Sequence, residues 1–213
     1  MPTVHSLVLF MAAGLALNLT PGPDMLYVAA RSTTEGRLAG VVSAIGIGAG
    51  TLVHIAALAL GLSALLTAVP VAYQAVRFAG AAYLIYLGVR ALLRPNAPAA
   101  APNVQRASLG AVFRQGVVTN VLNPKVALFF LAFLPQFVDP SRGNPVVQTT
   151  VLGLMFDAQG TLVNVAVALG ASAAGDWLRG RDGGGTRAAA VLGRVTGVIF
   201  IGLGARLALA SRK

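Results

Sequence analysis

Residues 17–24 read Leu-Asn-Leu-Thr-Pro-Gly-Pro-Asp, and this stretch interrupts the first long apolar run of the chain. Proline has no backbone N–H and clashes with the preceding helical turn, so Pro21 and Pro23 should unwind a helix here. The run before them, Leu7–Leu17, is apolar throughout. A second interruption, Asn123-Pro124-Lys125, follows in the other half of the chain. The sequence therefore predicts two helices that are each broken at a proline motif.

The composition is that of a membrane protein. Only 10% of the 213 residues are charged, and 56% are hydrophobic. A soluble globule with this composition would expose large apolar patches. A helix needs about 20 apolar residues to cross a bilayer. Apolar runs of that size occur at Leu7–Ala30, Ala39–Leu62, Val71–Leu93, Gly116–Phe137, Val147–Ala174 and Ala188–Ala210. The predicted fold is an all-α integral membrane protein with six transmembrane helices.

The residue content excludes several classes of protein. No cysteine is present, which removes disulfides, thiolate metal sites and iron–sulfur clusters. No P-loop, no H-E-x-x-H motif and no nucleophile elbow occurs, so the sequence predicts neither an enzyme nor a cofactor. The net charge of +10 comes from basic residues scattered between apolar runs. That pattern is typical of the flanks of membrane spans and not of a nucleic-acid-binding face.

Basic residues in the connections predict the orientation of the spans. The connections after the first, third and fifth spans carry ten arginines, whereas the opposite side carries five basic residues. Cytoplasmic loops are enriched in Lys and Arg, so we expect the odd-numbered loops in the cytoplasm and both termini outside. The first span has no basic n-region and runs straight into further spans. It is therefore expected to be a retained helix and not a cleaved signal.

The chain divides into two halves that resemble each other. Residues 94–115 read as a flexible cytoplasmic linker between a first repeat at 1–93 and a second at 116–213. Arg-x-x-Gly followed by Gly-x-Arg occurs at Arg77, Gly80, Gly88 and Arg90, and again at Arg194, Gly197, Gly204 and Arg206. Because each half has three spans, an odd number, the second half enters the membrane from the opposite side and is inverted relative to the first. The prediction is an inverted repeat forming one transport domain, and the alternative is that two Gly- and Arg-containing helices look alike by chance.

Polar residues beside the two breaks are the candidate substrate-binding residues. An intramembrane charge costs at least about 2.5–3.5 kcal/mol, so Asp24 and Lys125 need partners. We expect the breaks to face each other, so that a zwitterionic substrate competes for both charges, its ammonium for Asp24 and its carboxylate for Lys125. The alternative is a permanent Asp24–Lys125 bridge that only fixes helix packing. The candidate set is Asn18, Thr20, Pro21, Gly22, Pro23, Asp24, Asn120, Asn123, Pro124 and Lys125.

Three residues are candidates for proton coupling: Asp24, Asp157 and His54. Asp157 and Thr161 are four residues apart and therefore share one face of the fifth span. An intramembrane acid suits a proton relay, but an interhelical hydrogen bond explains Asp157 equally well. His54 is explained either by a relay role or by simple packing.

Six motifs, in order along the chain, carry a family resemblance. They are Thr20-Pro-Gly-Pro-Asp24, Gly36-Arg-x-x-Gly40, Gly80-Ala-Ala-Tyr83-Leu-x-Tyr-Leu-Gly88, Asn123-Pro-Lys-Val-Ala-x-Phe-Phe130, Phe133-Leu-Pro-Gln-Phe137 and Gly197-x-x-x-x-Gly202-Leu-Gly204-x-Arg206-Leu. In combination they resemble the LysE/RhtB family of bacterial amino-acid exporters.

The resemblance implies a six-span permease of the bacterial inner membrane, and the count of basic residues above then places both termini in the periplasm. It implies a secondary active exporter of amino acids or derivatives, such as threonine, homoserine or homoserine lactone, driven by proton exchange. The positions matching the family's two break motifs are Pro21, Gly22, Pro23 and Asp24, then Asn123, Pro124 and Lys125. A passive facilitator or channel and a related metal-ion exporter remain as alternatives. The expected partners are the amino acid, protons and lipid, and the sequence leaves a homodimer open.

Overall fold

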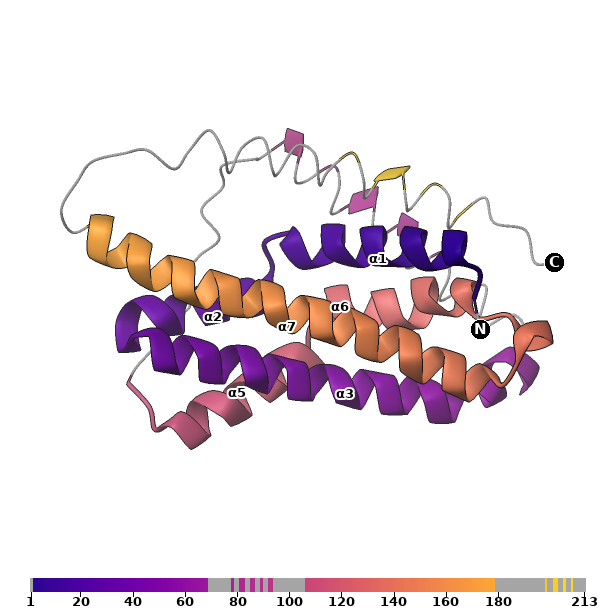
Figure 1. The fold of residues 1–213 in the computed structure, drawn as a ribbon, viewed down its shortest axis with the longest axis horizontal. Coiled ribbons are helices and arrows are strands. Elements are labelled where there is room, and N and C mark those ends of the chain that lie inside the picture. The colour runs from indigo at the N-terminus through magenta and orange to yellow at the C-terminus, as the bar shows by residue number, and fades with distance from the viewer. Residues whose placement is uncertain are drawn as a thin grey trace.

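The computed structural model of the chain describes residues 2–68 and 106–178, together with single positions between 78 and 93 and between 198 and 208. Every secondary-structure element in these ranges is helical (Figure 1). The expected third and sixth spans, Val71–Leu93 and Ala188–Ala210, and the start of the linker lie outside the described residues. The observed architecture therefore concerns the other four expected spans.

The first span is a pair of helices bent at the first proline motif. Helix α1 covers Val4–Leu19 and helix α2 covers Pro23–Glu35, and the two meet at an angle of 50°. Thr3 caps α1 by accepting a hydrogen bond from the backbone N–H of Ser6. Pro23 occupies the first turn of α2, where a missing N–H costs nothing. The predicted break in the first span is confirmed.

Two long unbroken helices form the second and fifth spans. Helix α3 covers Arg37–Ala68 and helix α7 covers Pro145–Leu178. Both are long and apolar enough to cross a membrane, and each bent pair passes the same test as one span. Gly36 separates α2 from α3 at a φ of 94°, a left-handed conformation that glycine adopts without steric cost.

The fourth span changes its helical geometry along its length. Helix α5 covers Leu109–Val121, α6 covers Pro124–Leu128, the π-helical η1 covers Phe129–Phe133 and the 3₁₀ turn η2 covers Leu134–Phe137. The bend between α5 and the helical stretch that follows is 45°, which confirms the second predicted break. Helix α5 starts at Leu109 and not at Gly116, because Ser108 caps it there. The last residues of the expected linker are thus helical.

A short turn and one buried glutamine shape the connection between the fourth span and α7. The 3₁₀ turn η3 covers Pro140–Arg142. The Gln148 amide donates to the backbone oxygens of Asp139 (2.8 Å) and Gly143 (3.1 Å), and its oxygen accepts from the Asp139 N–H. A hydrogen bond from the Ser141 hydroxyl holds the pKa of the Asp139 carboxyl below its ordinary value. This end of the bundle is therefore closed by local polar contacts.

The spans alternate in direction and pack closely. In Figure 1 the bent first span and α7 run one way, and α3 and the fourth span run the other way. Glycines allow the close approach of α3 to α5: a Cβ on Gly46 would lie 2.4 Å from the Phe113 carbonyl oxygen, and one on Gly116 would lie 2.8 Å from that of Ser43. Even one methyl at either position would push the two backbones apart.

Two apolar clusters lie on either side of the helix breaks. One is built on phenylalanines of α1, α7 and the fourth span, namely Phe10, Phe129, Phe130, Phe133, Phe137 and Phe156. The other joins Tyr27 and Val28 of α2 to residues of α3 and α7. Since α1 contributes to the first cluster and α2 to the second, the break between them falls in a polar layer between two apolar ones.

Candidate functional site

The first break is completed by a lysine from the other half of the chain. The Lys125 ammonium donates to the backbone oxygens of Leu17 and Thr20, each at 3.0 Å. Both carbonyls belong to the end of α1, where the regular intrahelical partners end, and the Leu17 carbonyl also accepts from the Thr20 N–H at 3.1 Å. A Cβ on Gly22 would lie 3.1 Å from the Lys125 Nζ, so glycine at this position leaves room for the lysine side chain. The two breaks therefore face each other, as expected.

The second break is completed by residues close to it in sequence. The Asn123 side chain accepts a hydrogen bond from the backbone N–H of Lys125 at 3.0 Å and so caps α6. Pro124 takes the first helical position, where its missing N–H leaves nothing unpaired. The carbonyl oxygen of Asn120, one turn earlier, also meets the His54 Nε2 at 3.1 Å. This break is thus capped mainly by its own motif.

The Asp24 carboxylate lies in the first turn of α2 and is almost fully buried. Its Oδ2 accepts a hydrogen bond from the Asn120 amide at 2.9 Å, and Asn123, Lys125 and His54 are further neighbours. Its Oδ1 has no hydrogen-bond partner within the described residues. Asp24 and Lys125 do not form an ion pair, because no carboxylate oxygen of Asp24 lies within 4.0 Å of the Lys125 Nζ. A direct Asp24–Lys125 bridge, the packing alternative, is therefore not what orders this region.

Helix α3 adds a threonine and a histidine to the polar layer. Thr51 is 4% exposed, and its hydroxyl lies 3.3 Å from the Asn120 Oδ1. His54, one turn later on the same helix, stacks on Phe130 with ring centroids 5.7 Å apart. These contacts tie α3 to the fourth span beside Asp24. Sequence reasoning missed Thr51, although its spacing of three residues from His54 places both on one face of α3.

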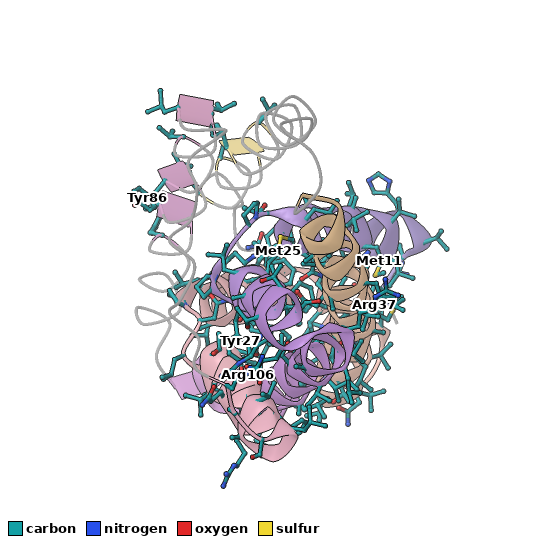
Figure 2. The ribbon with its side chains drawn as sticks, turned by 90° about the vertical axis from the view of Figure 1, so that its left-hand side faces the viewer. Met11, Met25, Tyr27, Arg37, Tyr86 and Arg106 are labelled. Atoms are coloured by element: carbon teal, nitrogen blue, oxygen red, sulfur yellow. The ribbon has the colours of Figure 1, made fainter. Side chains whose placement is uncertain are left out.

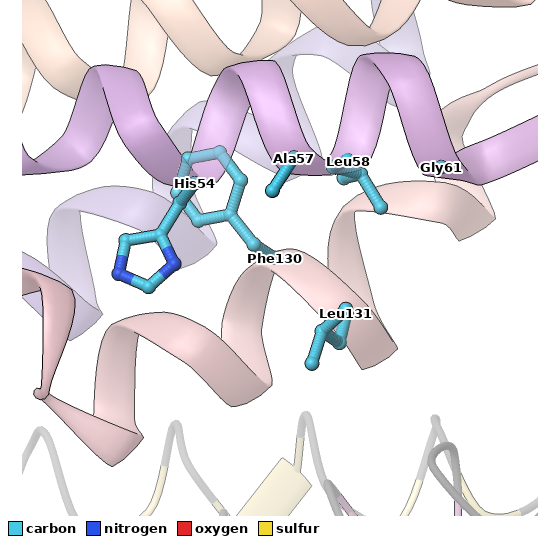
Figure 3. Close-up of a pocket in the computed structure, with 6 residues that line it drawn as sticks. All are labelled: His54, Ala57, Leu58, Gly61, Phe130 and Leu131. Carbon is cyan, nitrogen blue, oxygen red and sulfur yellow. The ribbon is translucent and has the colours of Figure 1, made fainter.

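A mainly apolar cavity of about 330 Å³ begins at His54 (Figure 3). In Figure 3 the wall on α3 and the wall on η1 face each other across it. Its lining consists of His54, Ala57, Leu58, Gly61, Phe130 and Leu131. His54 is the polar end of this cavity, since its ring also contacts Asn120 in the polar layer.

Asp157 of α7 lies on the opposite flank of α3 and is half-buried. The Thr161 hydroxyl is 3.5 Å from its Oδ1, and a Cβ on Gly48 would lie 3.3 Å from the same oxygen. Thr51, one turn after Gly48 on α3, is a further polar neighbour of this carboxylate. The shared helical face expected for Asp157 and Thr161 is thus present, and it packs against α3.

The ten candidate substrate-binding residues fall into three groups. Asp24, Asn120, Asn123 and Lys125 converge through their side chains. Pro21, Gly22, Pro23 and Pro124 set the backbone, and Thr20 contributes its carbonyl to Lys125 while its hydroxyl bonds back to Ala16. Asn18 faces elsewhere: its side-chain oxygen would lie 3.0 Å from a Cβ on Gly160 of α7. Of the candidates for proton coupling, His54 contacts Asn120 directly. Asp157 is connected to the group of Asp24, Asn120, Asn123 and Lys125 only through Thr51.

A second polar cluster ties α2 to α5 near the end of α2. Arg31 is buried, forms an ion pair with Glu35 and donates to the Gln115 side chain. The Tyr27 hydroxyl donates to the Val112 carbonyl at 2.8 Å, and Glu35 accepts from the Ala107 N–H at 3.1 Å. Figure 2 looks onto this end of the helices. Arg31 is one of the ten arginines that the sequence analysis counted in the connections. In the structure it is a residue of helix α2 with hydrogen-bonding partners of its own.

A comparison with known families identifies the class of protein. A family model described as LysE type translocator matches residues 15–211, which is most of the chain. The chain belongs to this family, and it is a translocator and not an enzyme. Together with the apolar helices described above, the match makes it a multi-pass membrane protein.

Individual relatives cover nearly the whole chain. An uncharacterized membrane protein of Pseudomonas aeruginosa is 34% identical over 201 residues, covering 91% of this chain and 90% of the relative. A leucine efflux protein of Salmonella typhimurium is 28% identical, with coverages of 93% and 92%. A homoserine/homoserine lactone efflux protein of the same organism is 28% identical, with coverages of 94% and 95%. No solved structure matches the chain.

Proposed function

We propose that the chain is a secondary active exporter of amino acids or close derivatives across the bacterial inner membrane. The family match and the two relatives named as efflux proteins support export as the activity. The observation that carries the substrate class is the pair of buried opposite charges, Asp24 and Lys125, at the meeting of the two helix breaks. A zwitterion is the ligand that needs both charges at once.

The unused bonding capacity of the two charges fits a zwitterion. An ammonium has three donors, and Lys125 directs two of them to the carbonyls of Leu17 and Thr20. One donor is left for a substrate carboxylate. The Asp24 Oδ1, which has no partner in the described part of the chain, is left for a substrate ammonium. The adjoining cavity that begins at His54 would receive the side chain of the amino acid.

The inverted repeat supplies the architecture for this site. In Figure 1 the first and fourth spans run in opposite directions, as do the second and fifth, which supports two repeats of three spans at 1–93 and 116–213 joined by the linker. Arg37, Arg106 and Arg114 lie near one end of the bundle, where α2 ends and α3 and α5 begin. That supports a cytoplasmic position for the odd-numbered loops and periplasmic termini.

Protons are the proposed coupling ion. Asp24 and Asp157 are intramembrane carboxylates, and such groups mark proton relays in pumps and transporters. In a proton antiporter, inward proton movement drives the amino acid outward. A passive facilitator with the same site would only equilibrate its substrate across the membrane.

Efflux from preloaded cells tests the proposal. Cells that produce the protein and cells with an empty vector are loaded with labelled leucine or labelled homoserine, and the release of label is followed with and without a protonophore. We expect faster release from the producing cells and loss of this advantage when the protonophore is added. Release that is unchanged by the protonophore would identify a facilitator. No faster release for any amino acid tested would contradict amino-acid export.

A further inference from the structure

The two intramembrane carboxylates are joined by a chain of two neutral side chains. The Asn120 Nδ2 donates to the Asp24 Oδ2 at 2.9 Å. At its other end, the Asn120 Oδ1 accepts from the Thr51 hydroxyl at 3.3 Å. Thr51 is in turn a neighbour of the Asp157 carboxylate. The chain crosses α2, α5, α3 and α7, and so connects both halves of the protein.

The contacts of α3 explain why Thr51 reaches both sides. Gly48, one turn before Thr51, has no side chain, and a Cβ there would lie 2.6 Å from the Thr161 hydroxyl oxygen. Gly50 leaves similar room for Asn120, because a Cβ on Gly50 would lie 2.8 Å from the Cβ of Asn120. Helix α7 on one side and helix α5 on the other therefore pack close enough to α3 for the Thr51 hydroxyl to lie between Asn120 and Asp157.

Thr51 has a single hydroxyl proton, so it donates in one direction at a time. The backbone oxygen of Ile47, one turn earlier on α3, lies 3.3 Å from the same hydroxyl and competes with Asn120 and Asp157 for this proton. When Asp157 is ionised, its carboxylate is the stronger acceptor and draws that proton. When Asp157 is protonated, it donates to the Thr51 oxygen, and the Thr51 proton turns to the Asn120 Oδ1. In this arrangement Asp157 donates to Thr51, Thr51 donates to Asn120, and Asn120 donates to Asp24. Hydrogen bonds that are aligned in one direction strengthen one another.

We propose that Thr51 and Asn120 couple the two carboxylates. A proton on Asp157 then weakens the binding of a cationic group at Asp24, and a cationic group bound at Asp24 weakens the binding of a proton at Asp157. A carboxylate that accepts a stronger hydrogen bond from Asn120 is a weaker base and binds a further cation less well. Neutralising Asp157 also removes a negative charge from the same region, which acts in the same direction. Since linkage is reciprocal, a cationic group at Asp24 disfavours the proton on Asp157.

This inference rests on the proposed function in one respect, because it takes the cationic group to be the substrate ammonium. Mutual exclusion of a proton and a substrate is what an antiporter requires. Two further titratable groups are neighbours of Asp24: Lys125 from α6 and His54 from α3. Within residues 2–68 and 106–178, the neutral hydroxyls of Thr51 and Thr161 are the polar neighbours of Asp157. Thr51 is therefore the link whose removal should weaken the coupling of the two acids to its through-space part.

The first experiment needs no substrate. The titration of the Asp157 carboxyl is followed by infrared difference spectroscopy on purified protein, and the D157N variant assigns the band. In otherwise wild-type protein, D24N should move the midpoint of the titration to lower pH by about one pH unit, the scale of a coupled pair. In the T51V background, D24N should move the midpoint by a clearly smaller amount, because only the through-space interaction of the two charges is left. An equal shift in both backgrounds would overturn the proposal.

The second experiment measures binding of labelled leucine, or of labelled homoserine where the efflux assay selects it, between about pH 5 and pH 8. We expect wild-type affinity to fall as the pH falls, by up to about tenfold per unit for one linked proton. D157N should lose the part of this dependence that comes from Asp157, T51V should lose most of that part, and the double variant should lose no more than D157N. T51S keeps the hydroxyl and should keep the wild-type profile. A wild-type profile in T51V or in D157N would overturn the proposal.

Matched variants separate coupling from folding. Thr149 of α7 is fully buried, and its hydroxyl has no partner within the described residues, so T149V is the control that should change neither readout. Where T51V does not insert, T51A removes the same hydroxyl without filling its space. Absence of binding to any amino acid by the wild type would contradict the proposed function, whereas the infrared result would still decide the coupling of the two acids.

Discussion

The two helix breaks differ in where their freed backbone groups find partners. At the first break, the carbonyls of Leu17 and Thr20 accept from Lys125, which lies more than a hundred residues away in sequence, and the Leu17 carbonyl also accepts from the nearby Thr20 N–H. At the second, the N–H of Lys125 is satisfied by Asn123, two residues away. In hydrocarbon each unsatisfied group costs several kcal/mol, so both breaks need partners. The first break therefore depends on the tertiary structure, and the second depends mainly on its own motif.

Removing Lys125 should have the largest effect on this pair of breaks. In K125M the Thr20 carbonyl loses its Lys125 donor and the Leu17 carbonyl keeps the Thr20 N–H, a loss of about 1–3 kcal/mol that is partly offset because no ammonium is buried. We expect a clear fall in Tm in detergent and no measurable export. K213M, which removes the only other lysine, is the control and should match the wild type. Wild-type export by K125M would contradict a role for this ammonium.

Neutralising Asp24 should separate substrate binding from stability. In D24N the side-chain oxygen still accepts from Asn120, so Tm should stay near that of the wild type. The charge that would hold a substrate ammonium is gone, and a hydrogen bond between charged groups contributes about 1.5–3 kcal/mol. We therefore expect export to fall by about 10- to 100-fold. D139N, at an exposed acid in the connection between the fourth span and α7, is the control for loss of one carboxylate.

Removing the cap of the second break should have a smaller, local effect. N123A loses the hydrogen bond to the Lys125 N–H, and the loss of an N-cap costs about 1 kcal/mol. The chain offers a matched cap outside the site, because Asn144 accepts from the Val146 N–H at 2.8 Å at the start of α7. We expect N144A to lower Tm modestly without changing export, and N123A to lower both. Equal export by the two variants would argue against a role for the second break in transport.

A methyl at Gly22 should have the smallest effect on stability. Gly22 has an extended backbone, with φ at −155°, so alanine brings no backbone strain. Its Cβ would lie 3.1 Å from the flexible end of Lys125, which should shift by a few tenths of an ångström. We expect a stability change below about 1 kcal/mol but export reduced by a few fold. G110A is the control, since nothing lies within 4 Å of a Cβ there.

Some features of the site could be predicted because they are local. Two prolines in Thr20-Pro21-Gly22-Pro23-Asp24 remove backbone donors wherever the helix is placed, and Asn123-Pro124 is both a cap and a helix start. The bends of 50° and 45° follow from those residues. That Asp24 and Lys125 should lie in one region also followed from the sequence, because isolated charges are costly in a membrane.

Other features could not be predicted, because they depend on which helix faces which. Lys125 contacts the carbonyls of α1 and not the Asp24 carboxylate directly. Asn18 turns toward α7, although it precedes the first break. Thr51 is a small residue in an apolar span and was not among the candidates, yet it lies between Asn120 and Asp157. Nothing local in the sequence marks any of these contacts.

The amino-acid sequence by itself determined the membrane environment, the family, the positions of the two breaks and the need of two buried charges for partners. These follow from hydropathy, from the missing N–H of proline and from the cost of a charge in hydrocarbon. Only the tertiary structure decided which atoms became those partners. The reason is geometric: a hydrogen bond needs its two atoms about 3 Å apart, and packing of helices from the two halves is what brings them there.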